Sequence, residues 1–269
     1  MSDSDFSATV ERFTGFGSHY DNVRPSAPTA LADLLFPLAK CEGKASLVVD
    51  LGCGTGLSTR YWMPFAESVV GVEPTDSMRE QAETVGGQNI SYRKGFSHAT
   101  GLEDRCADIV VCAQALHWME PLSTFAESAR ILKGAGVFAA YDYDWPPATT
   151  SWEVDQAYAS CMQLARRLEQ EQGITGRLKQ WDKAGHLARM QESGCFRFVR
   201  ECLLHHQDEG GAERIVGILL SQGYVQSLVK LGLSEKDLQI ERLREVAHRA
   251  FGSSFTRWFW SARVRIGVV

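Results

Sequence analysis

The sequence predicts an α/β protein built on a doubly wound, mostly parallel sheet with a helical cap. Three observations support this fold class. From about residue 45 to 142, short apolar runs alternate with helical patterns, which is typical of βαβ units. A glycine-rich turn follows the first apolar run, at residues 52–56. After residue 146 the pattern becomes mainly helical, and long insertions at one end of a sheet commonly form lids or substrate walls.

The first five strands are expected at residues 46–50, 69–73, 90–94, 108–113 and 136–141. Most of these segments are short runs of valine, isoleucine and alanine. Such nearly continuous apolar runs are typical of strands that are buried on both faces of a parallel sheet. Parallel neighbours need a crossover connection, and helices are therefore expected between the strands.

Two helices between these strands have clear start signals. One is expected to begin at Thr75 or Asp76, which are favourable N-cap residues, and to bury Met78, Ala82 and Val85. The other follows Pro121 and ends near residue 133, where a lysine and a glycine stop it. Its expected inner face consists of Leu122, Phe125, Ala126, Ala129 and Leu132.

The second half of the chain predicts the cap and two more strands. Residues 151–192 are expected to form helices, because apolar side chains recur there at helical spacing, at Tyr158, Met162, Ala165 and Leu168. Strands are expected at 196–205 and 263–269, and the stretch between them, about 210–258, is expected to be helical.

Composition excludes several classes of protein. The 269 residues are 44% hydrophobic and 23% charged, as in ordinary globular proteins. A net charge of −5 argues against a nucleic-acid surface, and no apolar run is long enough for a membrane span. The first nine residues are polar and acidic, so neither a signal nor a transit peptide is expected, and a cytoplasmic location follows.

Cysteine and histidine spacing predicts no metal site. The seven cysteines are scattered, without a C-x-x-C pair, and are expected to be reduced thiols rather than disulfides or zinc ligands. His205 and His206 are neighbours in a strand, so their side chains point to opposite faces. Arg166 and Arg167 are expected on a solvated helix face.

The most informative motif is the first strand with its turn. Asp50 ends the strand, Gly52, Gly54 and Gly56 form the turn, and Glu73 ends the next apolar run. Glycines let backbone N–H groups come close to a ligand, and the following helix adds its positive end. Two carboxylates at successive strand ends suit a ligand that carries an ammonium group and a ribose. This combination predicts S-adenosylmethionine.

A nicotinamide dinucleotide is the main rival, because an acidic residue about 20 residues after the glycines also fits that site. The glycine spacing argues against it, since residues 52–56 have the pattern G-x-G-x-G and not G-x-G-x-x-G. Asp50 would also repel a diphosphate, whereas it attracts an ammonium group. A dehydrogenase is therefore a remote alternative.

By these motifs the chain resembles the class I S-adenosylmethionine-dependent methyltransferases. The resemblance is greatest to the small-molecule branch of methyltransferase type 11, which includes trans-aconitate-type and ubiquinone-biosynthesis-type enzymes. It covers residues 13–142 and rests on the segments 20–25, 49–56, 71–78, 107–111 and 114–118. The resemblance implies a Rossmann-like, seven-stranded, mostly parallel sheet with an antiparallel last strand. Its last two strands are then expected near 197–205 and 262–268.

The resemblance also implies an organisation along the chain. Residues 1–145 would form the cofactor-binding core with an N-terminal segment. Residues 146–269 would add the helical cap and the last two strands within the same single domain. The implied cofactor-binding residues are Tyr20, Arg24, Asp50, Gly52, Cys53, Gly54, Glu73, Pro74, Met78, Phe96, Ser97 and Gln114.

The resemblance assigns parts of the cofactor to particular side chains. The glycine turn would wrap the methionine part, and Glu73 would bond the ribose hydroxyls. Met78 and Phe96 would flank the adenine, with Ser97 near its amine, although the family more often has an acidic residue at that place. Arg24 would clamp the carboxylate through a bidentate fork. Tyr20 would close over the sulfonium, because an aromatic face favours a cation.

The acceptor side is expected after the fourth and fifth strands, where open α/β sheets bind their ligands. His117 is a candidate general base, since imidazole titrates near neutral pH. The alternative is that it orients the cofactor or bonds to backbone groups. The candidate acceptor pocket is lined by Trp118, Tyr141, Tyr143 and Trp145. The alternative there is a polar loop with aromatic packing.

The predicted function is transfer of a methyl group from S-adenosylmethionine to an oxygen, nitrogen or carboxylate of a small organic acceptor by in-line displacement. No nucleic-acid or membrane partner is expected, and the oligomeric state stays open. One alternative is a sensor or assembly protein that binds the cofactor without catalysis. A less favoured one is an RNA or protein methyltransferase, since no basic surface is evident in the sequence.

Overall fold

The computed structural model describes residues 19–174 and 179–269, so the polar segment at residues 1–9, which is expected to be neither a signal nor a transit peptide, lies outside the described part. Its centre is one seven-stranded sheet of order β3-β2-β1-β4-β5-β7-β6. Six strands are parallel and β7 is antiparallel to its neighbours, which confirms the predicted fold class. The strands are β1 (Ala45–Leu51), β2 (Ala66–Val72), β3 (Ile90–Arg93), β4 (Ala107–Ala113), β5 (Leu132–Tyr143), β6 (Phe198–Gly210) and β7 (Thr256–Val268).

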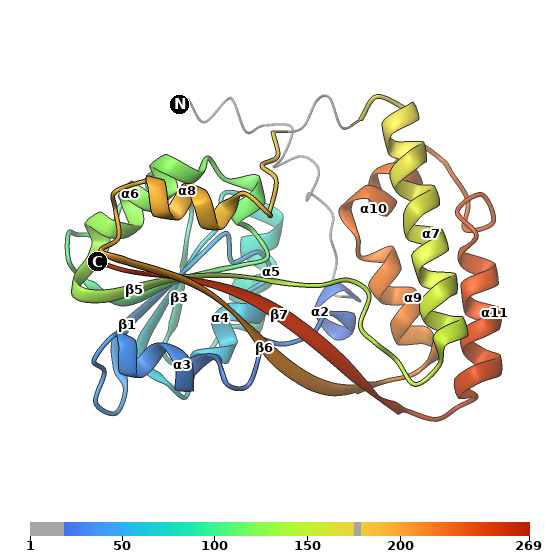
Figure 1. Ribbon diagram of the computed structural model, residues 1–269, viewed down its shortest axis with the longest axis horizontal. Coiled ribbons are helices and arrows are strands. Elements are labelled where there is room, and N and C mark those ends of the chain that lie inside the picture. The colour runs from blue at the N-terminus through green and yellow to red at the C-terminus, as the bar shows by residue number, and fades with distance from the viewer. Residues whose placement is uncertain (1–18, 175–178) are drawn as a thin grey trace.

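Helices cover both faces of the sheet (Figure 1). On one face lie α3 (Leu31–Leu38) and α4 (Leu57–Tyr61), and on the other α6 (Pro121–Ile131) and α8 (His186–Glu192). Apolar side chains from each pair pack against the strands in two separate clusters. The doubly wound arrangement follows, because strands with two apolar faces need a helical layer on each. Three further helices are α2 (His19–Val23), which precedes α3, and α5 (Asp76–Val85) and η2 (Leu116–Trp118), which follow β2 and β4.

The predicted inner faces of α5 and α6 need two corrections. Met78 and Ala82 are buried as expected, but Val85 in the last turn of α5 is 57% exposed. In α6, Leu122 is 55% exposed and Ala126 is exposed as well, while Thr124 and Ser128 are buried beside Phe125. The small polar residues can be buried because they bond locally: the Ser128 hydroxyl donates to the Thr124 carbonyl at 2.7 Å. An apolar pattern alone does not find such a face.

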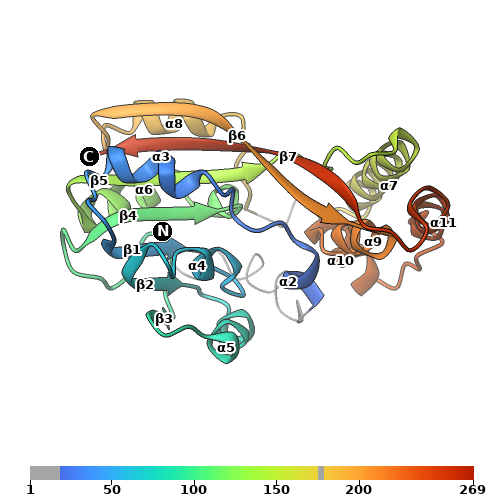
Figure 2. The same ribbon diagram turned by 90° about the horizontal axis from the view of Figure 1, so that it is seen from below.

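A long β6–β7 ribbon carries the cap (Figures 1 and 2). Strand β7 pairs with β5 only through residues 262–268, and its first half continues with β6 alone. Both strands are therefore longer toward the cap than the sequence predicted. The ribbon leads to the cap helices α7 (Trp152–Glu171), α9 (Ala212–Leu220), α10 (Gly223–Lys230) and α11 (Ile240–Phe251).

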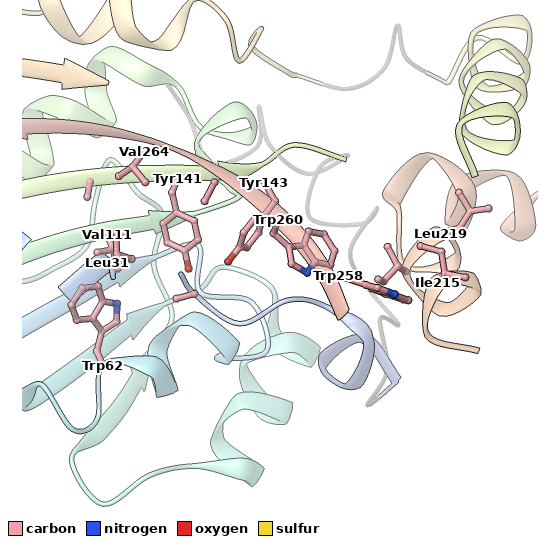
Figure 3. Close-up of a cluster of buried hydrophobic side chains, with 14 of the residues drawn as sticks. Leu31, Trp62, Val111, Tyr141, Tyr143, Ile215, Leu219, Trp258, Trp260 and Val264 are labelled. Atoms are coloured by element: carbon pink, nitrogen blue, oxygen red, sulfur yellow. The ribbon is translucent and has the colours of Figure 1, made fainter. Parts of the chain in front are cut away.

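One hydrophobic cluster continues from the sheet into the cap. Figure 3 shows Trp258 and Trp260 along β7 between Tyr143 of the sheet and Ile215 of the cap. Both indoles are at most 1% exposed, and the Trp260 Nε1–H donates to Asp208 Oδ1 at 2.7 Å. A buried indole needs such a partner for its N–H. Shared burial therefore holds the cap in place beyond the end of the sheet.

Candidate active site

The turn after β1 requires glycine. Gly52, Gly54 and Gly56 have φ angles of +63°, +56° and +81°, a region that other L-residues rarely adopt. A Cβ on Gly52 would lie 2.5 Å from Met119 Cε, and one on Gly56 would collide with the Tyr92 hydroxyl. Side chains therefore pack closely against the turn, and the turn itself lines a cavity at the carboxyl ends of the strands.

Replacing Gly56 by alanine is expected to lower the free energy of unfolding by about 1–3 kcal/mol, since it combines a left-handed backbone with a steric collision. Gly43 is a matched control, because it has nearly the same φ (+83°) but no atom within 4 Å of the place that a Cβ would take. Urea denaturation of both variants isolates the collision with Tyr92. Equal losses in the two variants would show that packing against the turn is unimportant.

Glu73 joins the end of β2 to the glycine turn. Its carboxylate is buried and accepts the Gly54 N–H on Oε2 and the Thr75 N–H on Oε1, each at 2.9 Å. Burial raises the pKa of Glu73, although these hydrogen bonds oppose the shift. Each carboxylate oxygen has a second lone pair, and Glu73 lines the cavity. The side chain can therefore accept hydrogen bonds from a ligand as well.

Asp50 lies beneath the turn and does not itself line the cavity. It is fully buried, and its Oδ2 accepts the Thr59 hydroxyl at 2.7 Å. Its Oδ1 has no hydrogen-bond partner among the described residues. Burial raises the pKa of Asp50 to about 7; the nearby hydroxyls of Thr59 and Ser58 oppose the shift, and the charge of Glu73 adds to it. The predicted direct contact between Asp50 and a ligand ammonium is therefore not seen. Asp50 can act on a ligand only electrostatically, from behind the turn.

The cavity beside the turn, hereafter the first cavity, brings together most of the predicted cofactor residues. Its predicted members are Arg24, Gly52, Cys53, Gly54, Glu73, Pro74, Met78, Phe96, Ser97 and Gln114. Asp50 lies behind it, and the side chain of Tyr20 lies outside the described part of the structure. The sequence analysis missed Thr55, Ser58, Thr75, His98 and Met119, which also line it. No feature of the sequence, other than their position in or beside the motif segments, marked these residues as part of a cavity.

The segment after β3 forms a small wall of the first cavity. The rings of Phe96 and His98 stack with centroids 5.5 Å apart, and Phe96 bridges to Ala99 across a tight turn. The Ser97 hydroxyl lies 2.8 Å from the Thr124 hydroxyl, and both groups are buried. Ser97 is thus already bonded to α6, which leaves Phe96 as the flat surface of this wall.

Arg24 connects the N-terminal segment to the cap. Its Nε donates to the Ser221 hydroxyl and its Nη2 to the Ser221 carbonyl, both at 2.8 Å. The guanidinium also lies 4.7 Å from the centre of the Trp145 ring. This arrangement differs from the predicted clamp on a ligand carboxylate, because two of the fork's donors point to the cap. Arg24 nevertheless lines the first cavity.

Asp21 in α2 holds the same segment against the glycine turn. Its carboxylate accepts the Thr55 hydroxyl and pairs with Arg60, whose Nη2 lies 2.5 Å from Oδ2. Arg60 also donates to the Thr55 carbonyl at 2.8 Å. Sequence analysis included Asp21 in a motif segment but gave it no role. The contact places the segment that contains Arg24 at the mouth of the first cavity.

A second cavity of about 650 Å³ lies between the strand ends and the cap. It meets the first cavity at Arg24, Gln114 and Trp118, which line both. Among the described residues its wall consists of Arg24, Gln114, His117, Trp118, Trp145, Arg166, Glu169, Gln170, Gln180, Trp181, Asp182, Lys183, Ser221, Gln222, Gly223 and Tyr224. The aromatic side chains on this wall come from the core, the cap and the connection before α8.

The predicted acceptor residues divide between these places. Trp118 and Trp145 line the second cavity, whereas Tyr141 lines the first, with its hydroxyl 3.2 Å from that of Ser58. Tyr143 lines neither: it is buried in the core and donates its hydroxyl to the Ser26 carbonyl at 2.6 Å. Arg166 is exposed, as predicted, and it also lines the second cavity, where its guanidinium lies 5.3 Å from the Tyr224 ring centre.

His117 lies on η2, buried at the wall of the second cavity. Its Nδ1 is 3.7 Å from Asp142 Oδ1 at the end of β5. Asp142 also accepts Lys183 Nζ at 2.6 Å and lies 3.3 Å from Arg265 Nη1. Burial alone would raise the pKa of Asp142, but the charge of Lys183, the neighbouring His117 ring and the charge of Arg265 hold it below its usual value. An ionised carboxylate therefore faces the imidazole.

Within residues 19–174 and 179–269, no group of three or more histidine, cysteine, aspartate or glutamate side chains is arranged to hold a metal ion. Over the same ranges, none of the helices combines the length and apolar character that crossing a membrane requires. Asp108 lies at the opposite end of the sheet, where it accepts the Ser46 and Leu47 N–H groups and pairs with Lys133. These contacts give Asp108 a structural role at the start of β4.

Known methyltransferase sequences match the first half of the chain. A family model for a methyltransferase domain matches residues 49–140. The yeast protein named probable S-adenosylmethionine-dependent methyltransferase CRG1, from Saccharomyces cerevisiae, is 32% identical over 135 residues, 48% of this chain and 46% of its own length. An uncharacterized methyltransferase of Mycobacterium tuberculosis, Rv3342, is 34% identical over 117 residues, 44% of this chain and 46% of its own length. The matched region thus spans about half the length of these relatives.

Comparison with solved structures extends over nearly the whole chain and supports the fold. A protein from Anaeromyxobacter dehalogenans that is assigned to the type II methyltransferases has a TM-score of 0.66 at 23% identity, over 91% of this chain and 97% of that one. YcgJ from Bacillus subtilis has a TM-score of 0.52 at 17% identity, over 88% and 97%. Residues 49–140 thus match a methyltransferase-domain family, and the sheet order and these solved structures show that the chain has a methyltransferase fold.

Proposed function

We propose that this chain transfers a methyl group from S-adenosylmethionine, bound in the first cavity, to a small organic acceptor bound in the second. The observation that carries this proposal is that the two cavities meet at Arg24, Gln114 and Trp118. A donor and an acceptor in adjoining cavities can be aligned for an in-line displacement. Such alignment is worth about 7–11 kcal/mol in favourable cases.

The chemistry of the first cavity suits this cofactor. Glu73 offers carboxylate lone pairs to hydroxyl donors such as those of a ribose. Asp50 Oδ1 has no partner among the described residues, and above the raised pKa of about 7 the carboxylate places negative charge under the turn, which favours a cationic ligand over a diphosphate. Phe96 and Met78 supply the apolar surfaces that a purine base needs. A carboxylate pair around a glycine turn thus fits a positively charged nucleoside.

When bound, S-adenosylmethionine supplies an electrophilic methyl group on a sulfonium. The chain binds the cofactor and the acceptor, orients them toward each other and excludes water. Trp118 lines both cavities, and the cap residues 221–224 line the second. A wall from the cap favours acceptors that fit inside about 650 Å³ over a folded macromolecule. The net charge of −5 also disfavours RNA.

Calorimetric titration of the full chain tests the first half of the proposal, with saturable binding of S-adenosylmethionine at one site as the expected result. Titration with a nicotinamide dinucleotide is the control, and no binding is expected. Transfer of a labelled methyl group to a panel of phenols, alcohols, amines and carboxylates tests the second half. Cofactor binding without transfer to any member contradicts catalysis and favours the sensor alternative. Absence of saturable cofactor binding contradicts the whole proposal.

A further inference from the structure

Asp142 and His117 form a pair that the proposed function does not itself require. We propose, resting on that function, that His117 Nε2 is the general base that deprotonates the acceptor and that Asp142 is the positioning residue that holds its ring as the Nδ1–H tautomer. The acceptor then carries a weakly acidic O–H or N–H group, such as a phenol, an alcohol or an ammonium group. A carboxylate acceptor is excluded, because it needs no base.

The first step of the argument is the orientation of the ring. Nδ1 is the nitrogen that faces Asp142 Oδ1, at 3.7 Å. A proton on Nδ1 directs a positive dipole end toward the carboxylate, whereas a lone pair there would face negative charge. Electrostatics therefore favours hydrogen on Nδ1 and leaves the lone pair on Nε2. The distance is longer than a hydrogen bond, and such contacts often tighten only when the ligand is bound.

The second step is that Asp142 stays charged. It is buried, and Lys183 Nζ and Arg265 Nη1 lie 2.6 and 3.3 Å from its two oxygens. The buried His186 of α8 lies near Asp142, and the charge of Asp142 affects the pKa of that imidazole. Arg265 is itself held by Glu201, whose Oε2 lies 2.9 Å from Nε. Lys183 and Arg265 thus keep Asp142 ionised, and its carboxylate faces His117.

The third step is where the ring sits. His117 lines the second cavity on the same 3₁₀ turn as Trp118, which lines both cavities. The His117 carbonyl accepts the Trp181 N–H at 2.9 Å, and Lys183 follows two residues later on the same connection. The backbone contact thus holds the turn that carries His117 at the wall of the second cavity, next to Trp118 at the junction of the two cavities.

The proposed step balances in atoms and charge. The O–H or N–H bond of the acceptor breaks, and its proton passes to Nε2 of His117. The acceptor lone pair forms the new bond to the methyl carbon, and the electron pair of the broken carbon–sulfur bond stays on sulfur. One positive charge thus disappears from the sulfonium and one appears on the imidazolium. That new charge lies 3.7 Å from the Asp142 carboxylate, which stabilises it.

The test is ¹⁵N NMR of the full chain labelled at histidine, at a pH where the ring is neutral. The two tautomers give different shifts at Nδ1 and Nε2, and His117→Gln identifies the signal by its loss. The wild type is expected to hold His117 mainly as Nδ1–H. Asp142→Asn is expected to shift most of the population to Nε2–H, which free imidazole favours in water. Lys183→Met is the matched control, and it is expected to keep Nδ1–H because the carboxylate remains.

Either of two results would overturn the proposal: a wild-type His117 that is mainly Nε2–H, or an Asp142→Asn variant whose tautomer is unchanged. The wild-type measurement decides even where Asp142→Asn fails to fold, although Glu201 should still hold Arg265 in that variant. Titration of the same samples with S-adenosylmethionine separates this proposal from the proposed function. Unchanged cofactor affinity with the wrong tautomer contradicts the general base alone.

Discussion

A Glu73→Gln variant is expected to bind S-adenosylmethionine about 10- to 150-fold more weakly than the wild type, the effect of losing one hydrogen bond to a charged group. The carboxylate accepts the Gly54 and Thr75 N–H groups and keeps lone pairs for two ligand hydroxyls. An amide replaces one acceptor oxygen by an NH₂ donor. That donor would face one of the backbone N–H groups, so both the turn and the ligand lose a partner.

Titration calorimetry measures this loss, and thermal unfolding shows whether the variant is folded. Glu67→Gln is the matched control, because Glu67 lies near the start of the same strand and is exposed. The control is expected to bind the cofactor as tightly as the wild type. A folded Glu73→Gln variant with undiminished affinity would remove the main support for placing the ribose beside β2.

Without cofactor, Asp50→Asn is expected to be more stable than the wild type at pH 8, by up to about 4 kcal/mol. The sign follows from the pKa of Asp50, which burial raises to about 7, above its usual value near 3.8. Below about pH 4 the carboxyl is protonated in both states. Between about pH 4 and 7 the unfolded chain loses the proton while the folded chain keeps it, so the wild type loses stability as the pH rises. Asparagine does not titrate and escapes this loss.

Urea denaturation at pH 5 and pH 8 measures the difference between variant and wild type. Asp108→Asn is a control of opposite sign, because Lys133 and the Ser46 hydroxyl hold the pKa of Asp108 below its usual value despite partial burial. That variant is expected to be less stable than the wild type at pH 8, and the deficit should shrink in acid. An Asp50→Asn variant with no pH-dependent gain would contradict a buried carboxylate under the turn. The variant is also expected to bind the cationic cofactor more weakly.

The agreement between sequence and structure is best where local features decide the outcome. The five predicted parallel strands, the helix starts at Asp76 and Pro121 and the glycine turn were all found at or near their expected positions. Apolar runs, N-cap residues and glycines act over a few residues and need no distant partner. The number of seven strands and the antiparallel last strand followed from the resemblance to a family, whereas the strand order came from the structure.

The helix faces show where such local reasoning stops. Leu122 and Val85 fit an apolar pattern yet are exposed, whereas Thr124 and Ser128 are buried. Which side of a helix is covered depends on the neighbour that packs against it. Ser97 provides that neighbour for α6, through its contact with Thr124, and nothing in the sequence near residue 124 indicates it.

By itself, then, the sequence determined the order of the elements, the glycine turn and the identity of the acidic residues beside it. Only the tertiary structure decided that Asp50 lies behind the turn, that Tyr143 belongs to the core and that Asp142 faces His117. Arg24 shows the reason most clearly, because its partner Ser221 is 197 residues away. Contacts across such separations arise from the packing of the cap on the sheet, and no local pattern encodes them.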